Sequence, residues 1–251
     1  MKCPYLDLRC YNSLWRLSIT GWCSSNLSFQ LDLFTNLRVL WLYHCLELDS
    51  FPEGGLPSNL SNLSIENCPK LIGSREEWGL FQLNSLKELY VSDEFENVES
   101  FPEENLLPPT LTFLCLNKCS KLRIMNYKGF LQLKSLRFLF INNYLSLESL
   151  PEEGLPNSLS TLSIRNCPLI KEKYEKEGGE RWHTISHIRD VLFWWNSIVD
   201  PTFGSNLFVT IGWEGVNIFL SKTSHQISLL FFLFYFPFLY CYFLASIFFP
   251  G

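Results

Sequence analysis

The side chains of this chain that could do chemistry are its nine cysteines and one pair of histidines. Zinc sites use such residues a few positions apart. Within residues 14–167 the one cysteine pair at that spacing is Cys115 and Cys119, and His183 and His187 lie four residues apart. No carboxylate or further cysteine is placed to complete either set, so we predict neither a metal nor another cofactor.

Four of the cysteines are better explained by their position than by their chemistry. Each stands ninth in a phrase of leucine, two variable residues, leucine, one variable residue, an aliphatic residue, two variable residues and cysteine; they are Cys45, Cys68, Cys119 and Cys167. In a stack of coils this slot lies at the turn that leaves a strand, where a small buried side chain packs on the neighbouring coil. We therefore interpret these cysteines as structural. Cys115 should then face away from Cys119, which makes that pair accidental.

The composition also excludes several classes of function. The net charge is -5 and no cluster of Lys and Arg is present, so we expect no nucleic-acid partner. The dipeptide Gly-Lys does not occur, so the sequence has no phosphate-binding loop. No nucleophile, base and orienting group converge in the pattern, and we predict that the chain is not an enzyme.

The element that must position all other side chains is the repeated phrase itself. It starts at residues 14, 37, 60, 86, 111, 136 and 159, and the starts are 23 to 26 residues apart. This is the period of leucine-rich repeats, in which each repeat is one coil with a short strand. We predict an α/β solenoid, a horseshoe with a parallel concave β-sheet and a mostly irregular convex side.

Two kinds of connector alternate between the predicted strands, so the sequence unit is a pair of coils of about 50 residues. One kind is rich in proline, with prolines at 52, 57, 102, 108, 109, 151 and 156, and proline excludes a regular helix there. The other kind begins at Gly79 or Gly129, and we expect a short helical turn in it.

Side chains alternate along a strand, so positions three, five and seven of the phrase should face out of the concave sheet. At position five the large residues Trp41, Tyr90 and Phe140 alternate with small ones. Either these aromatics are exposed anchors for a protein partner, or they cover their small neighbours for packing. We predict a protein-binding face that comprises Arg38, Trp41, Tyr43, Glu66, Lys87, Tyr90, Asn117, Arg137, Phe140 and Arg165, with Asn142 beside them.

The two ends of the chain differ from the repeats. There is no room for a full coil before Leu14, which predicts that the chain begins within a solenoid. Residues 1–191 should form the repeat domain, in which residues 168–191 cap the last coil through Trp182, Ile185 and Ile188. Residues 192–226 read as an irregular linker. Residues 227–249 carry no charge, and this apolar C-terminal tail is either a transmembrane helix or translation beyond the normal end.

The location of the protein follows from the same features. The first ten residues lack the apolar core of a secretory signal, so we expect a cytoplasmic protein with reduced thiols. The alternative of membrane attachment rests on residues 227–249. A second alternative, an extracellular repeat protein of the inhibitor type, rests on glycosylation acceptors at Asn26, Asn59 and Asn62.

Several longer phrases of the chain are distinctive. They are Leu-Pro-Ser-Asn-Leu at 56–60, Leu-Ser-Ile-Glu-Asn-Cys-Pro-Lys-Leu at 63–71, Leu-Glu-Ser-Leu-Pro-Glu-Glu-Gly-Leu-Pro at 147–156, Cys-Pro-Leu-Ile at 167–170 and Trp-His-Thr-Ile-Ser-His-Ile at 182–188. These phrases resemble the C-terminal leucine-rich-repeat region of plant coiled-coil nucleotide-binding disease-resistance proteins.

The resemblance covers about residues 1–191 and implies a recognition module of an intracellular immune receptor, without that receptor's nucleotide-binding domain. In such receptors the repeats hold the nucleotide switch inactive and help to detect pathogen effectors. The resemblance therefore implies a protein partner: a pathogen effector, a guarded host protein, or a nucleotide-binding domain supplied in trans.

Overall fold

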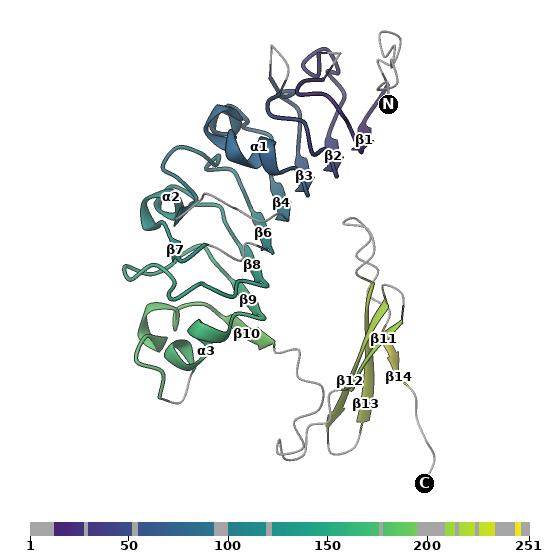
Figure 1. The fold of residues 1–251 in the computed structure, drawn as a ribbon. Helices are drawn as coiled ribbons and strands as arrows, with labels where there is room; N and C mark the ends of the chain where they lie inside the picture. Colours follow the sequence, from purple (N-terminus) through teal and green to yellow (C-terminus); the bar gives the residue numbers. More distant parts are fainter. Residues whose placement is uncertain are drawn as a thin grey trace. The chain divides into compact units, whose positions relative to one another are not determined.

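A computed structural model describes residues 13–27, 30–51, 55–92, 100–118, 122–175 and 178–194, and the backbone of four strands between 209 and 246. The chain divides into two units, Met1–Asn196 and Ser197–Gly251. In the first unit the coils follow one another along an arc whose inner side carries the strands (Figure 1). One parallel eight-stranded sheet contains, in order, β1 (Arg16–Thr20), β2 (Val39–Tyr43), β3 (Asn62–Glu66), β4 (Glu88–Ser92), β6 (Phe113–Asn117), β8 (Phe138–Asn142), β9 (Thr161–Arg165) and β10 (Asp190–Trp194).

The register of the sheet is that of the repeated phrase. Position four forms one continuous row across the strands, beginning Leu17, Leu40 and Leu63 and ending at Val191. Position six forms a second row, from Ile19 to Phe193. Both rows face the core, where most of their members are fully buried. Because a buried leucine or isoleucine stabilises by about 1.5–3 kcal/mol, these rows hold the coils together. The predicted α/β solenoid with a parallel concave sheet is confirmed.

Where the structure describes the turn that follows a strand of the large sheet, the eighth phrase position has a positive φ. The residues with φ between 52° and 65° there are Gly21, His44, Asn67, Lys118, Asn143 and Asn166. Asparagine tolerates this left-handed conformation better than most residues, which explains its recurrence. The turn directs the ninth residue back into the coil.

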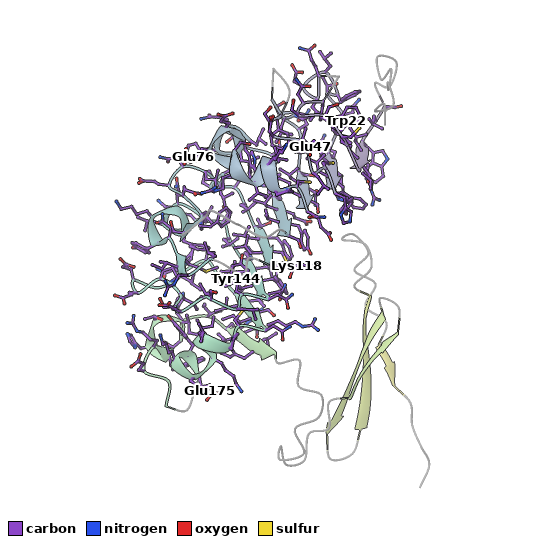
Figure 2. The ribbon with its side chains drawn as sticks, in the orientation of Figure 1. Trp22, Glu47, Glu76, Lys118, Tyr144 and Glu175 are labelled. Carbon is purple, nitrogen blue, oxygen red and sulfur yellow. The ribbon has the colours of Figure 1, made fainter. Side chains whose placement is uncertain are left out.

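The ninth position is buried, as predicted. The thiols of Cys45, Cys68 and Cys167 each lie 3.7–3.8 Å from a carbonyl oxygen of the preceding coil and 3.2–3.4 Å from one in their own coil. Trp22 and Tyr144 fill the same slot in other coils and are also buried (Figure 2). The structural interpretation of this slot is confirmed in these coils, whereas Cys119 lies outside the described residues.

The thiols are not all reduced, contrary to expectation. Cys45, Cys68, Cys115 and Cys167 form no disulfide, but Cys23 is disulfide-bonded. Of the three glycosylation acceptors, Asn62 lies within β3 and donates to the Glu88 carboxylate. The amide of Asn59 donates to the Thr35 carbonyl at 2.8 Å, and Asn26 is exposed.

The convex side is mostly irregular, with short helical segments. These are α1 (Pro69–Gly73), α2 (Tyr127–Leu131), α3 (Pro168–Tyr174) and the 3₁₀ turns η1 (Arg75–Glu77), η2 (Leu80–Gln82) and η3 (Trp182–Thr184). The short strands β5 (Ser100–Phe101) and β7 (Ile124–Met125) pair there in parallel. The helical turns expected at Gly79 and Gly129 are confirmed as η2 and α2. Gly129 packs so closely that a Cβ atom there would lie 2.6 Å from the carbonyl carbon of Pro102.

The C-terminal cap contains a strand that the sequence prediction missed. Ile185 and Ile188 are buried and Trp182 packs on the core, as expected. After them β10 pairs with β9, so the sheet continues past residue 191. Ile188, Val191 and Phe193 repeat positions one, four and six of the phrase, but Ile188 follows Leu159 by 29 residues instead of 23 to 26.

The second unit is an antiparallel sheet of β11 (Val209–Trp213), β12 (Val216–Thr223), β13 (Gln226–Leu233) and β14 (Leu244–Ser246). The expectation of an irregular linker over 192–226 and a helix over 227–249 is therefore wrong where these strands lie. Their Val, Ile, Thr, Phe and Trp content favours strands over helices. Residues 192–194 belong to β10, and the remaining residues of both segments lie outside the described ones. Within the described part of the chain, no helix is long and apolar enough to span a membrane.

Candidate protein-binding face of the sheet

The inner face of the sheet carries three rows of side chains, fixed by the strand register. The first row, at position three, runs Arg16, Val39, Asn62, Glu88, Phe113, Phe138, Thr161 and Asp190. The middle row, at position five, runs Ser18, Trp41, Ser64, Tyr90, Cys115, Phe140, Ser163 and Leu192. The third row, at position seven, runs Thr20, Tyr43, Glu66, Ser92, Asn117, Asn142 and Arg165.

Trp41 is not an exposed anchor, because only 3% of its surface is accessible. The Arg16 guanidinium lies 3.5 Å from the centre of its ring, and the Tyr43 ring meets it edge-on at 6.1 Å. Its register neighbour Ser64 is buried as well. At this end of the sheet the large residue of the middle row covers its small neighbour, which is the packing alternative of the sequence analysis.

Tyr90 and Asn117 are held by their neighbours. Burial raises the pKa of Tyr90 to about 12, so its hydroxyl stays protonated. The Asn117 amide lies 3.3 Å from that hydroxyl and 3.2 Å from Ser92 Oγ. Burial likewise raises the pKa of Tyr43. These groups present a neutral, hydrogen-bonded surface in the middle of the sheet.

A ladder of asparagines extends from Asn117 toward the C-terminal end. Asn166 donates to Asn143, and Asn143 donates to Asn117, with both bonds at 2.7 Å. Because the Asn143 amide accepts from Asn166 and donates to Asn117, the ladder links the rim of the sheet over three coils. Asn142 lies inside this rim and its amide is 3.8 Å from Cys115 Sγ. Asn117 and Asn142 therefore serve the rigidity of the face.

Exposed apolar side chains gather at the C-terminal half of the sheet. We call Phe113, Phe138, Phe140 and Leu192 the aromatic patch. The rings of Phe113 and Phe140 are 5.2 Å apart, and the exposed fractions of Phe138 and Leu192 are 40% and 41%. Phe113 and Phe138 are register partners on β6 and β8. Beneath them Cys115 is buried, which raises its pKa to about 12 and keeps the thiol neutral.

The predicted charged residues surround this face without meeting at one point. Arg38, Lys87 and Arg137 are exposed and each immediately precedes a strand. Glu66 and Arg165 are half-buried in the third row. The face is thus broad, apolar at one end and charged along its margin, which suits contact with a protein surface.

Sequence reasoning missed part of the aromatic patch. Phe113 and Phe138 stand at position three, which was predicted to face outward. The predicted binding face took its large aromatic residues from positions five and seven and did not include these two. Leu192 was missed because β10 was not predicted. Within the described residues, His183 and His187 are exposed, and no three side chains of the His, Cys, Asp or Glu types converge as metal ligands would.

Comparison with known proteins gives a partial relationship. No model of a protein family matches the chain. A protein of Arabidopsis thaliana that carries the provisional name of disease resistance protein is 39% identical over 133 residues. The aligned region covers 53% of this chain and 9% of the Arabidopsis protein. The chain is therefore related to a plant disease-resistance protein and spans a small part of its length.

Proposed function

We propose that this chain is a non-enzymatic recognition module of plant defence, which binds a protein partner through the inner face of its sheet. The aromatic patch carries the proposal. It places half-exposed phenylalanines on paired strands of a rigid sheet, with charged residues around them. Such aromatic anchors with a polar rim are typical of protein interfaces, where a few residues supply most of the binding free energy.

The relationship to a disease-resistance protein supports the biological setting. We propose, more specifically, that residues 1–196 correspond to the C-terminal repeats of a coiled-coil nucleotide-binding receptor and act in the cytoplasm. The partner would then be a pathogen effector, a guarded host protein or a nucleotide-binding domain in trans. The chain's own part in this is recognition, because its inner face offers contact surface over eight strands.

The proposed binding face has other central residues than the face predicted from the sequence. Trp41 stabilises the fold under Arg16, whereas Phe138 and Phe140 are the anchors. Arg137 immediately precedes β8 and Arg165 ends β9, so they lie at opposite edges of the sheet and would supply polar contacts on both margins of the face.

The experiment compares proteins retained from plant extract by the wild-type chain and by the double variant Phe138→Ala/Phe140→Ala, with quantitative mass spectrometry. Leu131→Ala is the control, because Leu131 is also an exposed apolar residue but lies on α2 of the convex side. We expect a set of proteins that wild type and the control retain and the double variant loses. Identical sets for all three chains would refute the assignment of the face.

A further inference from the structure

A second feature of the sheet is a regular row of charges at the edge where its strands begin. The residue immediately before each strand forms this edge row, which reads Trp15, Arg38, Ser61, Lys87, Thr112, Arg137, Ser160 and Arg189. From Arg38 onward every second member is a cation, and every member between them carries a hydroxyl. The cation therefore recurs once in every pair of coils, and not in every coil.

The backbone of the edge row is held by a continuous ladder of hydrogen bonds. Each carbonyl from Trp15 to Arg137 accepts the N–H of the next member of the row at 2.8–2.9 Å. The hydroxyls of Ser61, Thr112 and Ser160 donate to the same carbonyls at 2.9–3.0 Å. The Ser and Thr side chains of the row are therefore short, and their hydroxyls are already bonded to the backbone. The longer Arg and Lys side chains extend beyond them from a fixed backbone.

The three inner cations are free for an external anion. Arg38, Lys87 and Arg137 are exposed, and among the described residues no carboxylate forms an ion pair with any of them. Among the described side chains and carbonyls, Lys87 Nζ donates to the Thr110 carbonyl alone, at 3.4 Å. The fourth cation differs, because the Arg189 guanidinium lies 3.0 Å from the Asp190 carboxylate. A row of free cations stands out on a chain whose net charge is -5.

The spacing of these cations selects the shape of the anion. Neighbouring strands lie about 4.8 Å apart, so cations on every second strand recur at about 9.6 Å. A polyproline II helix has three residues per turn and rises about 3.1 Å per residue, so every third side chain lies on one side at about 9.3 Å. An extended β-strand places side chains of one side at about 6.6 Å and fails to match.

We propose that the edge row binds an acidic segment of a protein partner in the polyproline II conformation, with a carboxylate at every third residue. The segment would cross the strands, and successive carboxylates would meet Arg38, Lys87 and Arg137. This inference rests on the proposed function, because it names the chemistry of a segment that the partner carries beside the aromatic patch.

The test uses the full chain and a fluorescein-labelled peptide with five Glu-Pro-Pro repeats, measured by fluorescence anisotropy at low salt. The register control contains five Glu-Pro-Pro-Pro repeats, whose carboxylates wind around the helix. We expect the first peptide to bind at least about fivefold more tightly, because only it can engage successive cations. Equal affinities would overturn the proposal, and this comparison needs no variant of the protein.

Variants locate the site. Arg38→Glu/Arg137→Glu should weaken binding at least about tenfold, because two attractions become repulsions. Lys128→Glu/Lys134→Glu makes the same change of charge at exposed sites outside the edge row and should leave the affinity unchanged. Retained affinity in the first variant would overturn the proposal, and so would a 15-nucleotide single strand that binds as tightly as the matched peptide.

The outcomes separate this inference from the proposed function. Phe138→Ala/Phe140→Ala should bind the Glu-Pro-Pro peptide as wild type does, while it loses the captured proteins. If the peptide fails to bind but the aromatic-patch variant still loses partners, the edge-row assignment alone is wrong.

Discussion

The Arg16 guanidinium of β1 lies 3.5 Å from the centre of the Trp41 ring on β2. The contact joins two adjacent coils across the face on which a partner would dock, and it leaves the indole almost fully buried. Arg16 thus covers an aromatic side chain that strand alternation alone would expose to solvent.

Replacing Arg16 by methionine should lower the free energy of unfolding by about 0.5–2 kcal/mol, because the cation over the ring is lost while its packing is largely kept. Urea unfolding followed by circular dichroism measures the change. In a Trp41→Leu background the same replacement should cost less, and equal costs in both backgrounds would show that the two side chains are not coupled.

Trp41 and Phe138 should separate stability from binding. Trp41→Ala empties a buried site and should cost about 3–5 kcal/mol of unfolding free energy. Phe138 is 40% exposed, so Phe138→Ala should cost much less and still weaken partner binding. Urea unfolding and the extract experiment, run on both variants, check this. A larger loss of stability in Phe138→Ala would contradict the structure.

Gly129→Ala should destabilise the repeat unit by about 1–3 kcal/mol, because the new methyl group meets the backbone of Pro102 and one of them must move. Gly73→Ala is the control, since a Cβ at Gly73 meets no atom within 4 Å. Thermal unfolding of the two variants should differ accordingly, and similar melting temperatures would argue against the close packing of α2 on Pro102.

The stability of the fold should fall as the pH rises above 9, in part through Cys115. Burial raises the pKa of this thiol to about 12 from its ordinary 9.0. Between those values the folded chain keeps a proton that the unfolded chain has lost, so stability is full below pH 9 and decreases toward pH 12. The contribution of one such group is about 1.4 kcal/mol per pH unit.

Cys115→Ala removes this contribution. Urea unfolding at pH 8, 9 and 10 should therefore give a shallower loss of stability between pH 9 and 10 for Cys115→Ala than for wild type. The experiment excludes oxygen and omits reducing agent, so that the free thiols are not oxidised and the disulfide of Cys23 stays intact. Parallel curves for the two proteins would contradict a buried neutral thiol at this position.

The repeat signal predicted most of the first unit because its period fixes the register. Once Leu37, Leu60 and Leu86 are aligned, the residues that face the core and the residues that face outward follow from strand alternation alone. Burial of the ninth position followed in the same way for Cys45, Cys68 and Cys167.

The misses have physical causes that a period cannot supply. Trp41 was expected to face outward and does, but its burial depends on a neighbouring side chain, Arg16, which folds over it. The strand β10 was not predicted because the capping segment makes its coil longer than the 23–26-residue period. Ile188, Val191 and Phe193 nevertheless have the spacing of positions one, four and six of the phrase. The second unit has no repeat, so only its composition could indicate strands.

The hydrogen-bond ladder of the edge row also bears on how such a chain can change its length. Every coil offers the same backbone groups to its neighbours, so a recombination event could insert or delete coils without creating unmatched donors. The cations recur at intervals of 49, 50 and 52 residues, from Arg38 to Lys87, Arg137 and Arg189. Insertion or deletion of a whole coil pair would lengthen or shorten the edge row and keep the alternation of cations and hydroxyls. Exchange of a single coil would set two cations or two hydroxyls side by side and interrupt it.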